Sequence, residues 1–390
     1  MTGRNPTGEP GPAPAILQVL PALNVGGVER GTVEIAQAIV EAGWRAVVAS
    51  SGGPLVAEIE RAGGEHVALP LDSKNPLTMW RNVGRLHGLI RERDIAIVHA
   101  RSRAPAWSAL YAARRGGARF LTTFHGFYSA RTGLKRRYNA VMARGERVIA
   151  VSRFVAEHAA EVYGVPHSSL RTVPRGIDPE LFDPARVSEG RVARLREAWL
   201  AGGGGPVVML PGRLSRWKGH ATAVEAMARL SRADVRCLFV GAEAGSGGYG
   251  AVVRKAIDDA GLAGRVRFAG VCDDMPAAYL LADVVLVAST EPESFGRVAV
   301  EAQAMGRPLV AAEHGSTRET VIDGETGRLV PPGDVGALAR AISEALDLPP
   351  DRRAQRAEAA MRHVRTRFTL EAMRRGTLAV YRELLDKTPR

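Results

Sequence analysis

The chain has 390 residues, of which 46% are hydrophobic and 24% are charged, and its formal net charge is +12. This length exceeds one ordinary core and predicts two domains. Two cysteines are too few for a disulfide scaffold, and no apolar run approaches the roughly 18–20 residues of a membrane-spanning helix. Residues 1–14 are rich in Gly and Pro, so we expect a disordered tail and no secretory signal.

Short β-branched runs alternate with amphipathic stretches through the first half of the chain. Helices are predicted over 28–43 and 76–94, where apolar residues recur at helical spacing. Strands are predicted over 15–20, 45–51, 66–71, 95–100, 119–125, 147–152 and 170–174. Strands that are apolar throughout and alternate with helices indicate a parallel sheet covered on both faces. We therefore expect residues 15–180 to form one doubly wound, Rossmann-like domain.

Prolines and glycines interrupt this rhythm over 173–190, which places a domain junction at about 175–190. The alternation then resumes, with strands predicted over 206–212, 235–241, 265–270, 284–289, 308–313 and 327–332. We expect a second Rossmann-like domain over 186–368 and a closing C-terminal helix over 369–390. The predicted fold class is α/β, with two doubly wound parallel-sheet domains that face each other across a cleft. Such sheets bind ligands at the carboxyl ends of their strands.

Residues 101–147 form a strongly basic stretch, with eleven Lys and Arg residues and a single acid, Glu146. Aromatic residues are interspersed among the arginines. This combination is typical of a protein that binds an anionic membrane surface. A merely solvated basic face is an equal alternative, and nucleic acid is disfavoured because no nucleic-acid motif is present.

Two strand ends of the first domain carry candidate ligand-binding residues. Gly26 and Gly27 precede a helix predicted to begin near Val28, and a helix N-terminus is a natural anion site. A plain tight turn is the alternative. His125 and Gly126 follow the strand over 119–125, where a histidine faces ligands and can hydrogen-bond a sugar or a developing charge. Taken alone, a structural histidine with satisfied hydrogen bonds is the commoner explanation of His125.

Two cations follow the first strand of the second domain. Gly212 ends this strand, and Arg213 and Lys218 precede a helix predicted to begin near Gly219. Two cations beside a glycine suit a diphosphate. Two exposed surface cations are the alternative.

Two carboxylates, Glu293 and Glu301, stand eight residues apart around a predicted helix start at Phe295. We expect Glu293 in a loop and Glu301 about two turns into the helix, roughly 10 Å away. Carboxylates this far apart suit a long ligand with hydroxyl groups at both ends and anions between them, such as a sugar nucleotide. Spacing alone does not exclude chance.

Together these residues resemble the retaining glycosyltransferases of family 4, which have the two-domain GT-B fold and include enzymes of bacterial lipopolysaccharide and exopolysaccharide synthesis. The most specific resemblance is the motif from Glu293 to Glu301 with Ser294-Phe295-Gly296 inside it. The match covers about residues 15–385. It departs from the family pattern at Arg175, where many relatives carry Asn.

The resemblance also implies roles for individual residues. It implies that the catalytic residues are His125, Glu293, Arg213 and Lys218. It implies that the donor-binding residues are Gly27, Gly212, Ser294, Phe295, Gly296, Arg297, Val298 and Glu301. It implies acceptor-side positions at Gly26, Glu29 and Gly126.

We therefore expect a retaining hexosyltransferase that moves a sugar from a nucleotide-sugar, with UDP-sugar first and GDP-sugar second, to a lipid-linked saccharide. The expected location is the cytoplasm, on the inner face of the membrane. No Asp-x-Asp or histidine cluster has metal-ligand spacing, so neither a metal nor another cofactor is expected. The alternatives are a small soluble acceptor such as a sugar phosphate, and a non-catalytic polyanion-binding protein.

Overall fold

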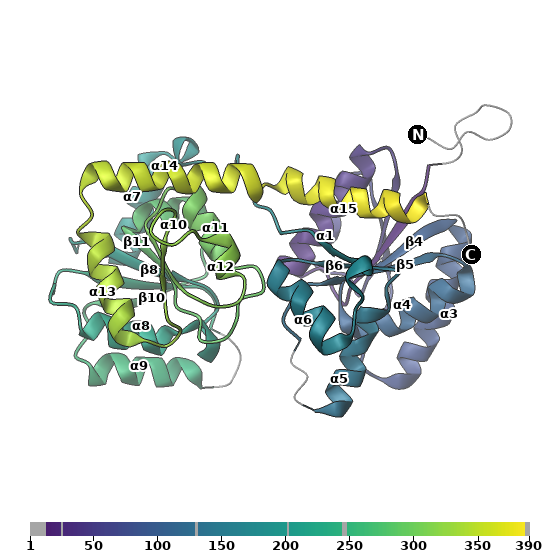
Figure 1. Ribbon diagram of the computed structural model, residues 1–390, viewed down its shortest axis with the longest axis horizontal. Helices are drawn as coiled ribbons and strands as arrows, with labels where there is room; N and C mark the ends of the chain where they lie inside the picture. The colour runs from purple at the N-terminus through teal and green to yellow at the C-terminus, as the bar shows by residue number, and fades with distance from the viewer. Residues whose placement is uncertain (1–12, 25, 129–131, 201–202, 244–247, 387–390) are drawn as a thin grey trace. The chain divides into compact units, whose positions relative to one another are not determined.

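The structure, a computed structural model, describes residues 13–24, 26–128, 132–200, 203–243 and 248–386. The disordered tail predicted over 1–14 lies outside these residues, apart from Ala13 and Pro14. The chain forms two compact units (Figure 1). The first contains residues up to Pro174 and those from Glu371 onward, and the second contains Arg175–Leu370.

The first unit is built on a seven-stranded sheet in the order β3-β2-β1-β4-β5-β6-β7, with all pairs parallel. Each predicted strand of the first half is present. The strands are β1 Ala15–Val19, β2 Arg45–Ser50, β3 Glu65–Ala68, β4 Ile95–Ala100, β5 Arg119–Phe124, β6 Arg147–Ala150 and β7 Leu170–Thr172. The order reverses between β1 and β4, so the carboxyl ends of these two strands form the switch point at which such sheets bind ligands.

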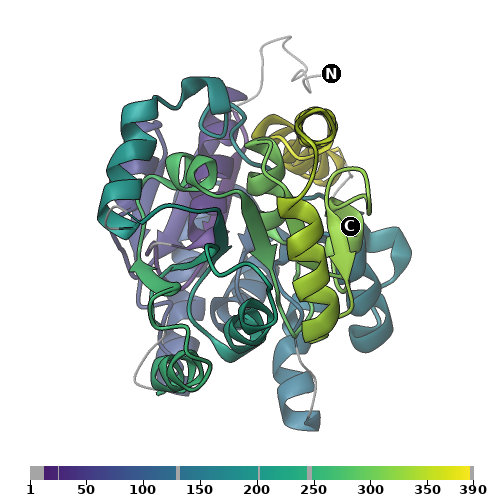
Figure 2. The same ribbon diagram turned by 90° about the vertical axis from the view of Figure 1, so that its left-hand side faces the viewer.

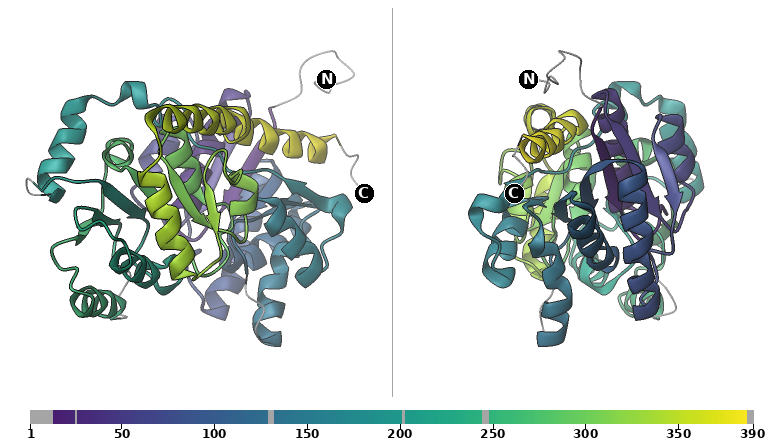
Figure 3. Two further views of the ribbon diagram at one scale, coloured as in Figure 1. Left: turned by 60° about the vertical axis from the view of Figure 1, so that its left-hand side comes forward. Right: turned by 90° about the vertical axis from the view of Figure 1, so that its right-hand side faces the viewer.

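Helices cover both faces of this sheet (Figure 3). They are α1 Gly27–Glu41, α2 Val56–Arg61, α3 Pro76–Glu92, α4 Arg103–Gly116, α5 Gly133–Asn139, α6 Arg153–Tyr163 and α15 Leu370–Leu385, with short 3-10 turns η1 Ala140–Arg144 and η2 His167–Ser169. Local chemistry sets their starts: Asn75 accepts hydrogen bonds from the backbone N–H groups of Leu77 and Thr78, which caps α3. The C-terminal helix α15 belongs to the first unit, because Tyr381 lies 2.7 Å from the buried His99 of β4.

The second unit has a six-stranded sheet in the order β10-β9-β8-β11-β12-β13, again all parallel. Its strands are β8 Val207–Pro211, β9 Arg236–Val240, β10 Val266–Gly270, β11 Val284–Val287, β12 Leu309–Ala312 and β13 Arg328–Val330. The switch point lies between β8 and β11. The sheets therefore confirm the predicted α/β fold of two doubly wound parallel domains.

Helices also cover both faces of the second sheet (Figure 2). They are α7 Glu189–Leu200, α8 His220–Ala228, α9 Tyr249–Asp259, α10 Met275–Leu281, α11 Arg297–Ala304, α12 Thr317–Thr320, α13 Val335–Leu346 and α14 Pro350–Arg367, with 3-10 turns η3 Pro184–Arg186 and η4 Arg216–Lys218. Helix α8 packs against α9 and α13, whereas α10 packs against α7 and α11 against α14. No helix in the described ranges is long and apolar enough to cross a membrane.

The prediction for the start of α11 is wrong by two residues. The helix begins at Arg297, because Gly296 adopts a left-handed conformation with φ of 73° as its N-cap. Phe295 instead packs its side chain into the core, with its ring centroid 5.8 Å from that of Phe368. Glu301 consequently lies just over one turn into the helix, and not two.

Candidate active site

The loops that follow β8 and β11 are locked together at the switch point of the second sheet. Gly219, with φ of +76°, packs so closely on β11 that a Cβ there would lie 1.9 Å from the carbonyl oxygen of Ala288. The backbone N–H of Thr290 donates to the carbonyl of Trp217 at 2.7 Å. Only glycine fits this position, and the contact brings the cations after β8 beside the acids after β11.

Glu293 lies at the centre of this junction and is 8% exposed. Its Oε1 accepts hydrogen bonds from Lys218 Nζ at 2.6 Å and from Ser289 Oγ at 2.6 Å. The other carboxylate oxygen makes no hydrogen bond with any residue that the structure describes. Lys218 and Glu293 thus form one largely buried ion pair, although the sequence analysis assigned them to different parts of a ligand. Arg213 lies exposed in the loop that precedes Lys218.

The position of Glu293 is fixed from the neighbouring strand. Its carbonyl accepts from the N–H of Ser316 at 3.0 Å, and Gly315 approaches it so closely that a Cβ would lie 2.5 Å from that carbonyl oxygen. Gly315 also has φ of +59°, a conformation that glycine adopts without strain. The loop after β12 therefore holds the loop after β11.

Glu301 is also buried, with 7% of the residue exposed. Each of its two carboxylate oxygens accepts a hydrogen bond from a side chain. Tyr279 OH donates to Oε2 at 2.7 Å, and Arg297 Nε donates to Oε1 at 2.6 Å. Burial and the adjacent carboxylate raise the pKa of Tyr279 well above its usual value, so this hydroxyl stays a donor. A ligand hydroxyl that reaches Glu301 would join a carboxylate already held in place.

Sequence reasoning missed Ser289 and Tyr279. Ser289 directly follows a buried strand, and its place at a carboxyl end was a usable signal. Tyr279 lies 22 residues before Glu301 on α10, and no local pattern links the two.

In the first unit, the Gly26–Gly27 loop and His125 lie at the same edge of the sheet, because they follow the parallel strands β1 and β5. Gly26 is the N-cap of α1 and has no side-chain capping bond. The carboxylate of Glu29 lies over it, since a Cβ on Gly26 would be 2.3 Å from Glu29 Oε2. Gly126 continues the loop after His125.

Arg101 is the first-unit residue that the sequence misplaced. It directly follows β4 at the switch point and is only 4% exposed, so it is not part of an exposed basic surface. Its Nε has no hydrogen-bond partner, and the guanidinium makes no ion pair within the described ranges. Burial lowers the pKa of Arg101, while Tyr381, Glu34 and Glu29 act in the opposite direction from farther away. Arg101 is therefore a buried cation without a close partner among the described residues, an arrangement that costs free energy.

Two further arginines of the basic stretch are tied to acids. Arg119 pairs with Glu146 at 2.9 Å, and Arg147 pairs with Glu383 of α15. The arginines at 101, 119 and 147 therefore contribute little to any exposed basic surface. The exposed cations of the stretch include Lys135, Arg136 and Arg137 on α5.

No group of three or more metal-ligating side chains comes together among the residues that the structure describes. The chemistry of the second-unit edge is instead that of cations, carboxylates and hydroxyl groups. The pairs Lys218–Glu293 and Arg297–Glu301 offer donors and acceptors suited to phosphate and sugar hydroxyl groups.

Comparisons with known proteins agree with this geometry. The family model for glycosyl transferases group 1 matches residues 192–363, and that for glycosyltransferase family 4 matches residues 25–181. A GDP-mannose-dependent alpha-(1-6)-phosphatidylinositol monomannoside mannosyltransferase of Mycolicibacterium smegmatis is 33% identical, over 72% of this chain and 74% of its own length. A D-inositol 3-phosphate glycosyltransferase of Acidothermus cellulolyticus is 34% identical, over 63% of this chain and 55% of its own.

Solved structures of other proteins have the same fold as this chain. A glycosyltransferase from Rickettsia africae superimposes with a TM-score of 0.89 at 35% identity, covering 96% of this chain and 100% of its own. The Anabaena protein HepE, solved with UDP and glucose, has a TM-score of 0.83 at 24% identity, covering 95% and 99% of the two chains. The chain therefore belongs to the family 4 glycosyltransferases of the GT-B fold.

Proposed function

We propose that the protein transfers a hexosyl group from a nucleotide-sugar, with retention of configuration, and that its second unit holds the donor. The observation that carries this proposal is the buried Lys218–Glu293 pair at the switch point of the second sheet. The negative charge that develops on a departing diphosphate needs a cation placed before the reaction begins. Lys218 is such a cation, with 17% of its side chain exposed and its ammonium group already positioned.

Donor binding, in this proposal, exchanges the partner of Lys218. The diphosphate takes the ammonium group and the exposed guanidinium of Arg213. Glu293 keeps its hydrogen bond from Ser289 and turns its freed acceptor capacity to hydroxyl groups of the transferred sugar. Glu301 receives the ribose hydroxyls, and the N-terminal turn of α11, which no side chain caps, lies nearby. These two cations would neutralise the leaving group without a metal.

For the donor we propose a UDP-sugar, with a GDP-sugar as the alternative because one relative is GDP-mannose-dependent. A thermal-shift panel of UDP, GDP and ADP tests the choice, since a ligand that binds only the folded state raises Tm. One nucleotide should raise Tm in the wild type and fail to do so in Lys218→Met. Equal shifts for all three in both proteins would support the non-catalytic polyanion-binding alternative.

For the acceptor we propose a lipid-linked saccharide, bound by the first unit at the membrane surface. Large apolar side chains are exposed on adjoining helices of this unit. They are Leu77, Trp80, Tyr111, Leu134 and Tyr138. Helix α3 packs on α4, and Trp107 of α4 donates to the carbonyl of Tyr138 of α5 at 3.1 Å. The exposed cations of α5 accompany this apolar surface, a combination suited to anionic lipid.

Sedimentation with vesicles of phosphatidylglycerol and phosphatidylcholine tests the membrane claim. Binding should fall as salt rises, and it should fall further in Trp80→Ser/Leu134→Ser, in which two exposed side chains are removed. Arg362→Ala, on an exposed ion pair of the second unit, is the matched control. Binding that ignores lipid charge would leave the small-acceptor alternative.

The second candidate is a soluble phosphorylated acceptor such as a sugar phosphate. The buried Arg101 at the switch point of the first sheet favours it, and one relative is a D-inositol 3-phosphate glycosyltransferase. Both candidates use an anion at the first unit, but only the first requires vesicles. Transfer to a soluble sugar phosphate in the absence of lipid would decide for the second.

A further inference from the structure

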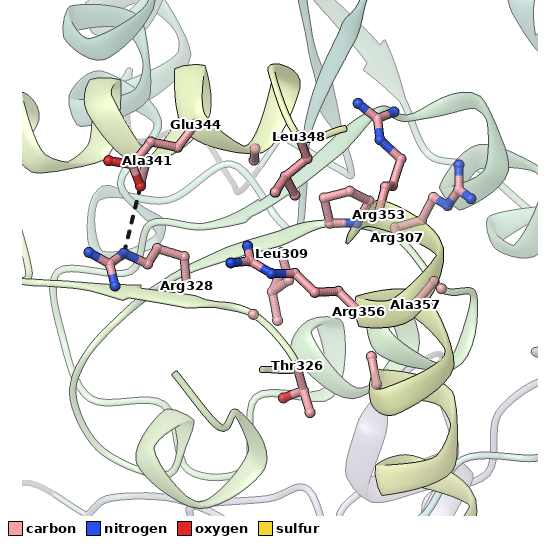
Figure 4. A pocket seen from close by; sticks show the side chains of 15 residues that line it. Arg307, Leu309, Thr326, Arg328, Ala341, Glu344, Leu348, Arg353, Arg356 and Ala357 are labelled. Atoms are coloured by element: carbon pink, nitrogen blue, oxygen red, sulfur yellow. Dashed lines mark ion pairs between the residues drawn. The ribbon is translucent and has the colours of Figure 1, made fainter. Parts of the chain in front are cut away.

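A cavity of about 180 Å³ in the second unit is lined by four arginines, Arg307, Arg328, Arg353 and Arg356, and by one acid, Glu344 (Figure 4). Because a water molecule takes about 30 Å³ of the liquid, this volume admits a ligand of several heavy atoms. Leu309 and Leu348 supply apolar lining between the charges.

This cavity lies at the opposite edge of the sheet from the donor site. Leu309 is the first residue of β12 and Arg328 is the first residue of β13. Glu293 and Lys218 follow the carboxyl ends of β11 and β8. Because all these strands are parallel, the arginine cavity is at the amino edge and cannot share the donor's diphosphate.

The cations of the cavity are incompletely neutralised. Arg356 makes no ion pair or hydrogen bond with any described residue, and Figure 4 shows it reaching from α14 toward Arg328 beside Leu309. Arg328 donates a hydrogen bond to Asp323, which does not line the cavity, at 3.3 Å, and it lies 4.0 Å from Glu344. Half of its side chain is exposed.

The other two arginines lie together at the far end of the cavity (Figure 4). Within the described part of the chain, Arg307 donates hydrogen bonds to the carbonyl groups of Met305 at 3.3 Å and Ala282 at 3.5 Å. Arg353 reaches the carboxylate of Asp283 at 3.8 Å. Burial lowers the pKa of Arg307, the nearby carboxylate of Asp283 raises it, and the like charge of Arg353 lowers it again. An anion beside Arg307 and Arg353 would add to the partial compensation that Asp283 provides.

We propose that this cavity is a second anion site, which binds a small phosphorylated molecule independently of the donor site. Planar guanidinium groups donate paired hydrogen bonds that match phosphate oxygens. Four of them around one acid suit a group with more than one negative charge, and the leucines suit a neutral body attached to it.

Inorganic pyrophosphate, followed by isothermal titration calorimetry, is the test probe. To remove binding at the donor site and at Arg101, the measurement uses Arg101→Met/Arg213→Ala/Lys218→Met as the background protein. This background should still bind pyrophosphate, and adding Arg356→Ala should weaken binding at least tenfold. Arg356→Glu should abolish it. Arg362→Ala, which removes an exposed arginine from the same helix α14, should bind as the background does.

Circular dichroism melting of each variant controls for folding. Among the described residues, Arg356 has no hydrogen-bond or ion-pair partner whose loss would destabilise the fold. The proposal is overturned if Arg356→Ala and Arg362→Ala weaken binding equally, or if the background protein binds no pyrophosphate. The second result would mean that such anions bind only at the donor site or at Arg101, and it would leave the proposed function intact.

Discussion

The two sheets present contrasting chemistry at their carboxyl edges. In the second unit every buried charge at this edge has a close partner, with Lys218 on Glu293 and Arg297 on Glu301. In the first unit the buried Arg101 has none among the described residues. Paired side chains are held in place before a ligand binds, and they exchange partners when it does. An unpaired buried cation lowers the stability of the free protein, and a bound anion would remove this desolvation penalty. This contrast supports our proposal that the second unit positions charge for the donor and that the first unit binds an anion.

The largest effect is expected when the ammonium group of Lys218 is removed from the carboxyl edge of the second sheet. Lys218→Met should lower kcat by about 10²–10³-fold, because the lost cation acts where charge develops. It should also destabilise the fold by about 3 kcal/mol, because Glu293 is left buried without its cation. Lys218→Met/Glu293→Gln should regain stability but not turnover. Steady-state kinetics measures the change in kcat, and urea unfolding measures the change in stability. A double variant that recovers activity would contradict the role proposed for Lys218.

Glu301 is expected to affect nucleotide affinity more than turnover. Glu301→Ala should weaken nucleoside diphosphate binding by about tenfold to a hundredfold, since hydrogen bonds to a charged group contribute about 1.5–3 kcal/mol. Tyr279→Phe is the control, because it keeps the carboxylate and removes one of its donors. Calorimetric titration measures both. Affinity lost equally in the two variants would mean that packing around α11, and not the carboxylate, is what matters.

The buried guanidinium of Arg101 is expected to lower the stability of the free protein. Replacing a buried unpaired guanidinium by an apolar side chain should raise the free energy of unfolding, so Arg101→Met should be more stable by about 1–3 kcal/mol. It should also lose activity toward an anionic acceptor. Urea unfolding with a matched activity assay measures this. If Arg101→Met is instead strongly destabilised, Glu29 and Glu34 hold the guanidinium as a structural group.

The smallest expected effect concerns the paired arginines of the first unit. Hydrogen bonds from Arg147, and then from Arg171, lower the pKa of Glu383 to about 2 despite partial burial. A carboxylate with a depressed pKa stabilises the fold above its unfolded pKa, and this contribution is lost as pH falls toward the folded value. Glu383→Gln should therefore cost about 1–2 kcal/mol at pH 7, after solvent screening. Unfolding curves of the two proteins should converge between about pH 4.5 and pH 2, and a constant difference would contradict this account.

The sequence predicted the strands and their parallel arrangement because largely apolar runs such as Ala15–Val19 and Val207–Pro211 are buried at every position. It also placed Lys218 and Glu293 at strand ends. It did not predict that they pair, because that depends on Gly219 packing against Ala288 across two strands. Arg101 was misplaced for a similar reason: net charge counts an arginine without showing whether it is buried.

In the proposed reaction, Lys218 leaves Glu293 and binds the donor's diphosphate. A crystal structure of the protein with bound nucleoside diphosphate-sugar tests it most directly. We predict phosphate oxygens within hydrogen-bond distance of Lys218 Nζ and Arg213, with a sugar hydroxyl on Glu293. A diphosphate bound elsewhere, for example among Arg328 and Arg356, with the Lys218–Glu293 contact intact, would contradict the account.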